Sequence, residues 1–421
     1  MESRALALVG AASLAAAAYL LYRRRRVASS AALPTTGAHT VTRSLGTRSG
    51  VEVTVLGQGG ASLGDLYLRI SDADALATLQ CAHACGVSFF DTSPWYGVGL
   101  SEARFGLALF RAPRDSFVFQ TKVGRFLVPD PQGRNGAPTG WINGYHFTIT
   151  FDYTAEALER QWQDSLQRTG LGRVDSLVIH DLEPMAAGGG DPAPGSGKDG
   201  LAGARAHLEV LRTSGLKTLR RLRSSGAVKA FGAGVNSDEN GEDKAKKRAW
   251  NREYVDALLG FDESARGGER GLDFFLLANM YSLLNFEAHA EGILDKCLAA
   301  GVGVVVGGPY SSGILATGSR PKNGRPPMYN YEPANEEVLG RCRGIEAVCA
   351  RHRVPLIAAA LQFPLGHAAV SCVIPGGKSP SEVRSNVELM NVPIPAAFWS
   401  ELKATGLIPS DAHTPLGRGA S

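Results

Sequence analysis

The sequence predicts an α/β protein folded as a (β/α)8 barrel, the TIM-barrel architecture. From about residue 50 onward, short apolar runs alternate with longer segments of helical periodicity, and eight such strand–helix pairs follow one another. The apolar runs are nearly continuous, which is typical of strands that are covered on both faces. A length of 421 residues is enough for one such barrel with additional segments. A doubly wound parallel sheet would show the same alternation and is the alternative fold.

The first four pairs occupy the first half of the chain. Ser71 is suited to cap the first helix, and Gly86 is suited to end it. The expected strands are Val53–Leu56, Val87–Phe90, Phe117–Thr121 and Ser176–Ile179, and the expected helices are Asp72–Cys85, Ser101–Phe110, Thr154–Arg168 and Leu208–Ser224.

The remaining four pairs follow with the same alternation. The expected strands are Ala230–Val235, Phe274–Leu277, Val302–Val306 and Ser371–Ile374, and the expected helices are Lys244–Leu259, Ala288–Ala300, Glu336–Arg351 and Ser381–Leu389. Two stretches rich in Gly, Pro and small residues, Val128–Phe147 and Pro184–Gly203, follow strand ends, so we expect them to be inserted loops over the catalytic face. The charged stretch Ser237–Lys247 is expected to be a solvated connection.

The N-terminus differs in composition from the rest of the chain. Ala5–Tyr22 carries no charge and is followed directly by Arg23–Arg26, which favours a short membrane segment with its basic flank in the cytoplasm. We therefore expect a signal anchor on a cytoplasmic catalytic domain. Because no acidic residue lies between Glu2 and Glu52, a transit peptide for a plastid or a mitochondrion is the alternative. The expected organisation is an N-terminal segment over 1–26, a linker over 27–50, the barrel over 51–400 and a C-terminal tail over 401–421.

The composition excludes several classes of protein. The formal net charge is +4, and four of the basic residues lie in Arg23–Arg26, so the body lacks the broad basic face of a nucleic-acid-binding protein. Six cysteines without a C-x-x-C pair exclude a disulfide scaffold, a zinc ribbon and a thioredoxin-type redox site. The sequence also lacks a Walker A loop and an H-E-x-x-H motif, and we expect no metal site.

Polar residues follow three consecutive strands at the edge where a barrel carries its chemistry. Asp91 ends the second strand, Lys122 the third and His180 the fourth, and Tyr96 lies in the loop after Asp91. An ammonium near a tyrosine stabilises the phenolate, so Lys122 would lower the pKa of Tyr96, and Asp91 would hold Lys122 in place. His180 would bind the substrate oxygen. Tyr96 would then exchange a proton while the electron pair moves as hydride, which requires a nicotinamide.

These residues resemble the aldo-keto reductase superfamily, and the resemblance runs from about Val53 to Val392. The spacing D-x-x-x-x-Y and the strand-end Lys and His match that family's catalytic tetrad at Asp91, Tyr96, Lys122 and His180. The segments FGAGVNS, LLANMYSLL, GPYSSGILATG and VIPGGKSPSEVRSNV match in the same order. The sequences of the segments VIHDLEP and IPGGKSPSEV are most similar to the D-threo-aldose 1-dehydrogenase and L-galactose dehydrogenase branch. This implies oxidation of an aldose at its anomeric carbon, from lactol to lactone, in carbohydrate metabolism.

The resemblance also implies the cofactor. Aligned back from Asn386, Glu382 stands where NADP-binding members carry an Arg, and a carboxylate repels a 2′-phosphate but accepts a hydrogen bond from a ribose hydroxyl. We therefore expect NAD rather than NADP. The residues implied to contact the cofactor are Asn236, Ser312, Gly313, Leu315, Lys378, Glu382 and Asn386.

Three positions depart from the family's pattern around the nicotinamide. Val235 replaces the usual Ser, Ala278 replaces the usual Gln, with Asn279 next to it, and Gly307 replaces the aromatic residue that stacks on the ring. Two other functions therefore stay open: an NADPH-dependent carbonyl reductase, and a non-catalytic cofactor-binding subunit. Trp95 and Trp141 are candidate walls of the substrate pocket. We expect a small sugar or another small carbonyl or alcohol as substrate, and a monomer or small homo-oligomer.

Overall fold

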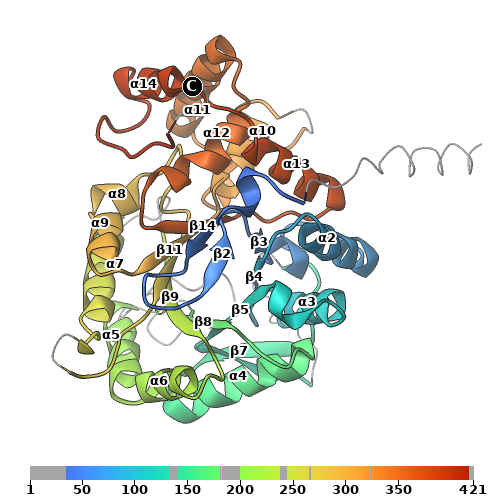
Figure 1. Cartoon of the computed structure of the whole chain (residues 1–421), viewed down its shortest axis with the longest axis vertical. Helices are drawn as coiled ribbons and strands as arrows, with labels where there is room; N and C mark the ends of the chain where they lie inside the picture. The colour runs from blue at the N-terminus through green and yellow to red at the C-terminus, as the bar shows by residue number, and fades with distance from the viewer. Residues whose placement is uncertain are drawn as a thin grey trace, which may run out of the picture. The chain divides into compact units, whose positions relative to one another are not determined.

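The barrel is formed by eight parallel strands (Figure 1). The computed structural model describes residues 35–131, 141–180, 182, 200–237, 244–264, 267–321 and 324–416, and Thr36–Ser421 is one compact unit. In spatial order the strands are β3 (Gln58–Gly59), β4 (Phe89–Asp91), β5 (Val118–Val123), β8 (Ser176–Ile179), β9 (Ala230–Asn236), β10 (Phe274–Ala278), β11 (Gly303–Gly307) and β14 (Val370–Ile374). The predicted fold is confirmed.

The ring of strands closes where the first strand segment meets β14. Leu56 and Val373 form a parallel bridge, the Gly57 N–H donates to the Val373 carbonyl at 2.9 Å, and the Val373 N–H donates to the Val55 carbonyl at 2.9 Å. A barrel has no unpaired sheet edge, so every strand has hydrogen-bonded neighbours on both sides.

Helices surround the barrel (Figure 1). Ser71 caps the first helix as expected, because its Oγ accepts the Asp74 N–H at 3.1 Å. The helices are α2 (Asp72–Ala84), α3 (Leu100–Leu109), α4 (Ala155–Thr169), α5 (Gly200–Val210), α6 (Leu216–Ser224), α7 (Lys244–Leu259), α8 (Glu287–Ala290), α9 (Ile293–Ala299), α10 (Ile314–Thr317), α11 (Glu336–His352), α12 (Leu356–Gln362), α13 (Pro380–Met390) and α14 (Ala396–Ala404).

The fourth predicted helix starts earlier than expected. A π-helical turn at Leu211–Gly215 joins α5 to α6, so the helical path runs from Gly200, inside the stretch expected to be a loop. Gly215 lies against the Tyr153 carbonyl, and a Cβ at Gly215 would be 2.3 Å from that oxygen. The rest of the expected loop, 184–199, lies outside the described residues.

The start of the barrel differs from the prediction. The expected strand Val53–Leu56 is divided: β2 (Glu52–Thr54) pairs antiparallel with β1 (Thr42–Ser44), and the barrel strand follows as β3. Val51 and Val53 are buried in the same core cluster as Cys372, so the β1–β2 hairpin covers the amino-terminal end of the barrel. Residues 36–50, expected to be a linker, therefore belong to the compact unit because their apolar side chains complete its core.

The turn of this hairpin depends on a glycine. Gly46 has φ +80°, and a Cβ there would be 2.1 Å from the Asp273 carbonyl. Only glycine combines that backbone angle with so close an approach. The turn can therefore press directly against the barrel where β10 begins.

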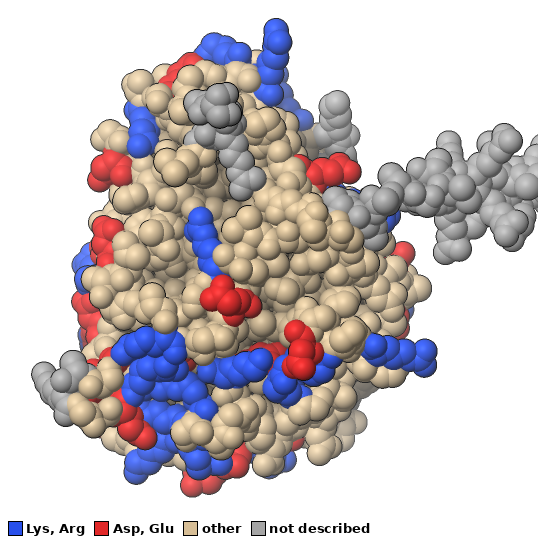
Figure 2. Space-filling view, viewed as in Figure 1, with Lys and Arg blue, Asp and Glu red and all other residues tan. Residues whose placement is uncertain are grey.

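Ion pairs line the same end of the barrel. Asp175 precedes β8, is fully buried, and accepts hydrogen bonds from Arg114 and Arg173. Asp273 precedes β10 and pairs with Arg223 and Arg270. Basic side chains gather with acidic ones on the lower part of the face seen in Figure 2. Polar groups at the amino-terminal end of barrel strands serve stability rather than chemistry.

An antiparallel ribbon extends from the opposite end of the barrel. β6 (Arg125–Pro129) directly follows β5 and pairs with β7 (Phe147–Phe151). The stretch Val128–Phe147 was expected to be a loop, but both of its ends belong to this ribbon, and residues 132–140 lie outside the described part of the chain. A second short ribbon, β12 (Met328–Tyr329) with β13 (Glu332–Pro333), lies between α10 and α11.

The two chain ends were expected to be separate from the barrel. At the C-terminus, α14 extends to Ala404, and Ile408 and Ala412 are buried, so the expected tail packs on the protein as far as these residues. The apolar segment Ala5–Tyr22 and the cluster Arg23–Arg26 lie outside the described residues. Among the helices of the described part, none is long and apolar enough to cross a membrane.

Candidate active site

The four polar residues predicted at the strand ends lie together at one site. Asp91 is the last residue of β4, Lys122 lies near the end of β5, His180 follows β8, and Tyr96 lies in the loop before α3. The Lys122 Nζ is 4.7 Å from the centre of the Tyr96 ring. The rings of Tyr96 and His180 are nearly perpendicular, with centroids 6.2 Å apart. Consecutive parallel strands therefore bring the four side chains to the carboxyl-terminal rim of the barrel.

The Lys122 ammonium has a fixed position. Its Nζ donates to Asp91 Oδ1 at 2.9 Å, to Asp91 Oδ2 at 3.0 Å and to the Thr92 carbonyl at 2.8 Å. These bonds account for all three N–H groups of an ammonium. The Lys122 side chain is 2% exposed, so this charge is held in a medium where its electrostatic effect is strong.

A further amide supports the carboxylate. Gln120 donates from Nε2 to Asp91 Oδ1 at 2.7 Å, and its Oε1 accepts a hydrogen bond from Ser176 Oγ at 3.0 Å. Sequence reasoning did not identify Gln120 or Ser176. Both are fully buried polar residues on the adjacent strands β5 and β8, where polar residues are uncommon, and this is the signal that could have found them.

His180 is held at both its backbone and its ring. The Tyr153 hydroxyl donates to the His180 carbonyl at 2.8 Å, and Ser93 Oγ lies 3.1 Å from His180 Nδ1. His180 is 5% exposed and Ser93 is fully buried. These two partners were also not predicted, because the distances depend on how the segments after β4 and β7 approach the end of β8.

Aromatic rings form a wall beside Tyr96. The Trp141 ring lies 5.6 Å from the Tyr96 ring and 6.1 Å from the Trp95 ring, centroid to centroid, and the two indoles are perpendicular. Both predicted wall residues therefore belong to the same site. The Arg125 guanidinium lies 4.3 Å from the centre of the Trp95 ring, a cation–π contact that fixes the indole. Trp141 itself is held by a bridge to Leu66.

The residues expected to contact the cofactor lie along the other half of the rim. Asn236 ends β9, Ser312 and Gly313 form the turn after β11, and Leu315 is buried in α10. Asn386 lies on α13, and its Oδ1 accepts a hydrogen bond from Tyr310 at 2.6 Å. The strands β9, β10, β11 and β14 are neighbours in the barrel, so these residues follow one continuous arc.

Glu382 and Lys378 lie at the start of α13 and contact each other. Ser379 caps the helix, and Glu382 Oε2 accepts the Lys378 backbone N–H at 2.9 Å. The Lys378 Nζ is 3.9 Å from Glu382 Oε1, and both side chains are a little less than half exposed. One carboxylate and one ammonium are thus presented side by side where the resemblance places the adenosine end of the cofactor.

The chemistry of this arc fits a nicotinamide dinucleotide. Asparagine amides and serine hydroxyls suit a carboxamide and ribose hydroxyls, and Lys378 suits a phosphate. At the end of β10, Asn279 is 7% exposed, and its Oδ1 has no hydrogen-bond partner within the described residues. A buried acceptor without a partner is suited to bind a ligand that has an N–H group, such as a carboxamide.

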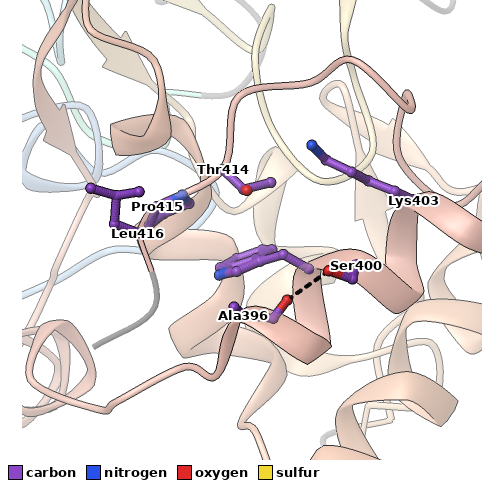
Figure 3. Close-up of a pocket in the computed structure, with 7 residues that line it drawn as sticks. Ala396, Ser400, Lys403, Thr414, Pro415 and Leu416 are labelled. Atoms are coloured by element: carbon purple, nitrogen blue, oxygen red, sulfur yellow. Dashed lines mark hydrogen bonds between the residues drawn. The ribbon is translucent and has the colours of Figure 1, made fainter. Parts of the chain in front are cut away.

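Two hollows lie away from this rim. One, of about 170 Å³, is formed between α14 and the C-terminal segment by Ala396, Trp399, Ser400, Lys403 and Thr414–Leu416, and Figure 3 shows the Ser400 hydroxyl bonded to the Ala396 carbonyl. The other, of about 240 Å³, lies beside the β1–β2 hairpin. Ligand pockets span roughly 300–1,000 Å³, and neither hollow contains a predicted site residue, so we do not assign the chemistry to them.

The fold and the rim together define a (β/α)8 barrel oxidoreductase. The chain belongs to the aldo/keto reductase family, whose family model matches residues 55–406. Members of this family use nicotinamide cofactors and act on small carbonyl or alcohol substrates. The family predicted from the sequence motifs is confirmed.

Curated relatives match over nearly their whole length. A pyridoxal 4-dehydrogenase from Microbacterium luteolum is 35% identical over 375 residues, covering 87% of this chain and 97% of that protein. A D-threo-aldose 1-dehydrogenase from a Pseudomonas species is 33% identical over 368 residues, covering 86% of this chain and 97% of that protein. The solved holo form of an aldo-keto reductase from Bacillus halodurans superposes with a TM-score of 0.58, at 21% identity, over 89% of this chain and 98% of that chain, which supports the fold alone.

Proposed function

We propose that this protein oxidises the anomeric carbon of an aldose, of the D-threo-aldose or L-galactose type, from lactol to lactone with NAD. The observation that carries the proposal is the position of Lys122, which is fixed by both oxygens of Asp91 and lies 4.7 Å from the Tyr96 ring. A buried ammonium beside a phenol stabilises the phenolate, which is the form that takes a proton. The relative named as an aldose dehydrogenase supports the substrate class.

Each residue of the rim has a distinct role in this reaction. The Tyr96 phenolate, whose negative charge Lys122 stabilises, takes the proton from the anomeric hydroxyl and becomes neutral. Asp91 keeps Lys122 charged and in place, and His180 donates a hydrogen bond to the substrate oxygen as it becomes a carbonyl. A nicotinamide held by the residues of this rim would supply the acceptor for the hydride that leaves the anomeric carbon. The lactol thus loses one hydride and one proton, and the lactone, NADH and H⁺ are the products.

The aromatic wall favours a second candidate substrate. Trp95 and Trp141 present ring faces and edges beside Tyr96, and aromatic rings pack well against a planar heterocycle. Together with the relative named as a pyridoxal 4-dehydrogenase, this supports pyridoxal as an alternative to an aldose. The apolar face of a sugar ring would use the same wall.

The proposed cofactor is NAD. A 2′-phosphate on the adenosine ribose would meet the Glu382 carboxylate, whereas an unmodified ribose would give Glu382 a hydroxyl donor. Lys378, 3.9 Å from that carboxylate, would contact a phosphate of the cofactor. The proposed contacts of the nicotinamide half are Asn236, Ser312, Gly313, Leu315 and Asn386.

The test is a spectrophotometric screen of free aldoses and pyridoxal with NAD and NADP, following the reduced cofactor. Tyr96→Phe should lower kcat at least 100-fold while cofactor affinity stays within about threefold, because general acid–base groups supply about 10²–10⁴-fold. Tyr281→Phe is the matched control, since the buried Tyr281 hydroxyl has no hydrogen-bond partner within the described residues. Activity of Tyr96→Phe within threefold of wild type would rule out the proposed role. Turnover of carbonyls with NADPH alone favours the reductase, and no turnover with either cofactor favours a non-catalytic subunit.

A further inference from the structure

The His180 imidazole is held by a serine that the proposed reaction does not use. Ser93 lies two residues after the end of β4, its side chain is fully buried, and its Oγ is 3.1 Å from His180 Nδ1. Either nitrogen of a neutral imidazole can carry the proton, and the partners of the ring decide which one does.

The second partner of Ser93 fixes the direction of this hydrogen bond. The backbone N–H of Trp95 donates to the same Ser93 Oγ at 3.1 Å. A hydroxyl has one proton and two lone pairs, and the amide can only donate, so one lone pair is occupied. Within the described residues, His180 Nδ1 is the acceptor in reach of the Ser93 proton. If Nδ1 carried a proton instead, the fully buried Ser93 hydroxyl proton would lack an acceptor among the described residues, and leaving a buried donor unpaired is unfavourable.

We infer that Ser93 is a positioning residue that fixes neutral His180 with its proton on Nε2. Nε2 lies across the ring from Nδ1, so the proton is placed at the end of the imidazole that Ser93 does not contact. The Tyr153 hydroxyl donates to the His180 carbonyl at 2.8 Å, so the backbone that carries the ring is held in place as well.

The tautomer separates the tasks of His180 and Tyr96. An imidazole with its proton on Nε2 and its Nδ1 occupied by Ser93 can donate a hydrogen bond to a carbonyl oxygen, but it has no free lone pair with which to take a proton. The proton must then pass to Tyr96. This consequence rests on the proposed function, whereas the tautomer itself is a property of the free protein.

The tautomer is tested by NMR on the full-length chain labelled with ¹³C and ¹⁵N in histidine only, without cofactor or substrate. The ring Cδ2 and nitrogen shifts of His180, identified by loss of the signal in His180→Gln, should show the proton on Nε2. In Ser93→Ala the signal should move towards the other tautomer, and Ser93→Thr, which keeps a hydroxyl, should restore it. Ser165→Ala removes an equally buried serine on α4 that bonds to Arg168, and should leave the His180 signal unchanged.

Kinetics test the role of the fixed tautomer. With the substrate found in the screen, Ser93→Ala should lower kcat by about 10- to 100-fold and keep KM within threefold of wild type. The reason is that the substitution misplaces the His180 N–H donor but leaves the surface that binds the substrate unchanged. Ser93→Thr and Ser165→Ala should stay within threefold of wild type. Ser93→Cys, of similar size and a weak donor, replaces Ser93→Ala if that variant does not fold.

The outcomes separate the two proposals. A wild-type His180 with its proton on Nδ1, or a Ser93→Ala signal identical to wild type, would overturn the inference whatever the enzyme oxidises. An unchanged kcat in Ser93→Ala despite a changed tautomer would overturn the positioning role. The predicted tautomer in a protein that turns over no aldose would support the role of Ser93 in fixing the ring and would count against the proposed function alone.

Discussion

Removing the Lys122 ammonium should expose how strongly the catalytic rim depends on one buried ion pair. In Lys122→Met, Asp91 would remain buried, with its side chain 3% exposed, and would lose hydrogen bonds of 2.9 and 3.0 Å. Breaking a buried ion pair on one side costs about 3–5 kcal/mol, because an uncompensated charge remains. The Gln120 amide still donates to Asp91 Oδ1 at 2.7 Å, so we expect the lower end of this range, about 3 kcal/mol.

Urea unfolding of the full-length chain, followed by tryptophan fluorescence, measures this loss. Asp91→Asn combined with Lys122→Met removes both charges and should recover about 2 kcal/mol relative to Lys122→Met alone, since a neutral pair is less costly to bury. Turnover should be lost in both variants, because neither can stabilise the Tyr96 phenolate. The reasoning fails if Lys122→Met unfolds within about 1 kcal/mol of wild type, or if the double variant is no more stable than the single one.

Four further predictions concern other parts of the chain. Deleting residues 1–32 should leave a folded, active enzyme, since the compact unit begins at Thr36; a collapse of the melting temperature would contradict this. Glu382→Arg should narrow or reverse the ratio of kcat/KM with NAD to that with NADP, and an unchanged ratio would mean that the carboxylate does not face the ribose. Burial lowers the pKa of His367 below its usual 6.5, although the hydrogen bond that its ring donates to Asp295 opposes this shift. The unfolded chain therefore binds more protons than the folded one, so wild type should lose more stability than His367→Gln as the pH falls from 7 to 5. His367, Asp295 and His413 lie close enough together to suggest a zinc site, but zinc should not raise the melting temperature. His367 Nδ1 accepts the Ala369 N–H, so the ring proton is on Nε2, which faces Asp295. Neither ring nitrogen of His367 then offers a lone pair to a metal.

The sequence was enough to locate the four candidate catalytic residues, but not the residues that hydrogen-bond to them. Asp91, Lys122 and His180 could be placed because each ends an apolar run, and parallel strands bring such ends to one rim. Ser93 could not be found in this way, because its importance depends on the distance between two loops, and Gln120 is marked in the sequence only as a polar residue inside an apolar strand. A side chain that bonds across a barrel leaves no periodic signal in its own segment.

Two misplaced elements have a common physical reason. The run Val53–Leu56 is too short to distinguish a hairpin strand from a barrel strand, since both bury alternate or continuous apolar residues. The Gly and Pro content of Val128–Phe147 indicates a loop, yet at its two ends Val128 pairs with Thr148 and Pro129 with Phe147 in the β6–β7 ribbon. In both places, antiparallel pairing with the neighbouring strand along the chain overrode local composition.

The hairpin that covers the amino-terminal end of the barrel also affects how the protein is made. Arg43 donates to the Val370 carbonyl, and Ser44 accepts a hydrogen bond from Ser371, in each case across a separation of 327 residues. A ribosome that adds about 5–20 residues per second needs roughly 15–65 s to synthesise that stretch. During this interval Val51 and Val53 cannot yet pack against β14, because that strand has not been synthesised. The nascent chain therefore exposes apolar surface of the kind that chaperones bind. A translation product that stops before β14 would therefore lack the strand that closes the barrel and leave Val51 and Val53 without their packing partners there.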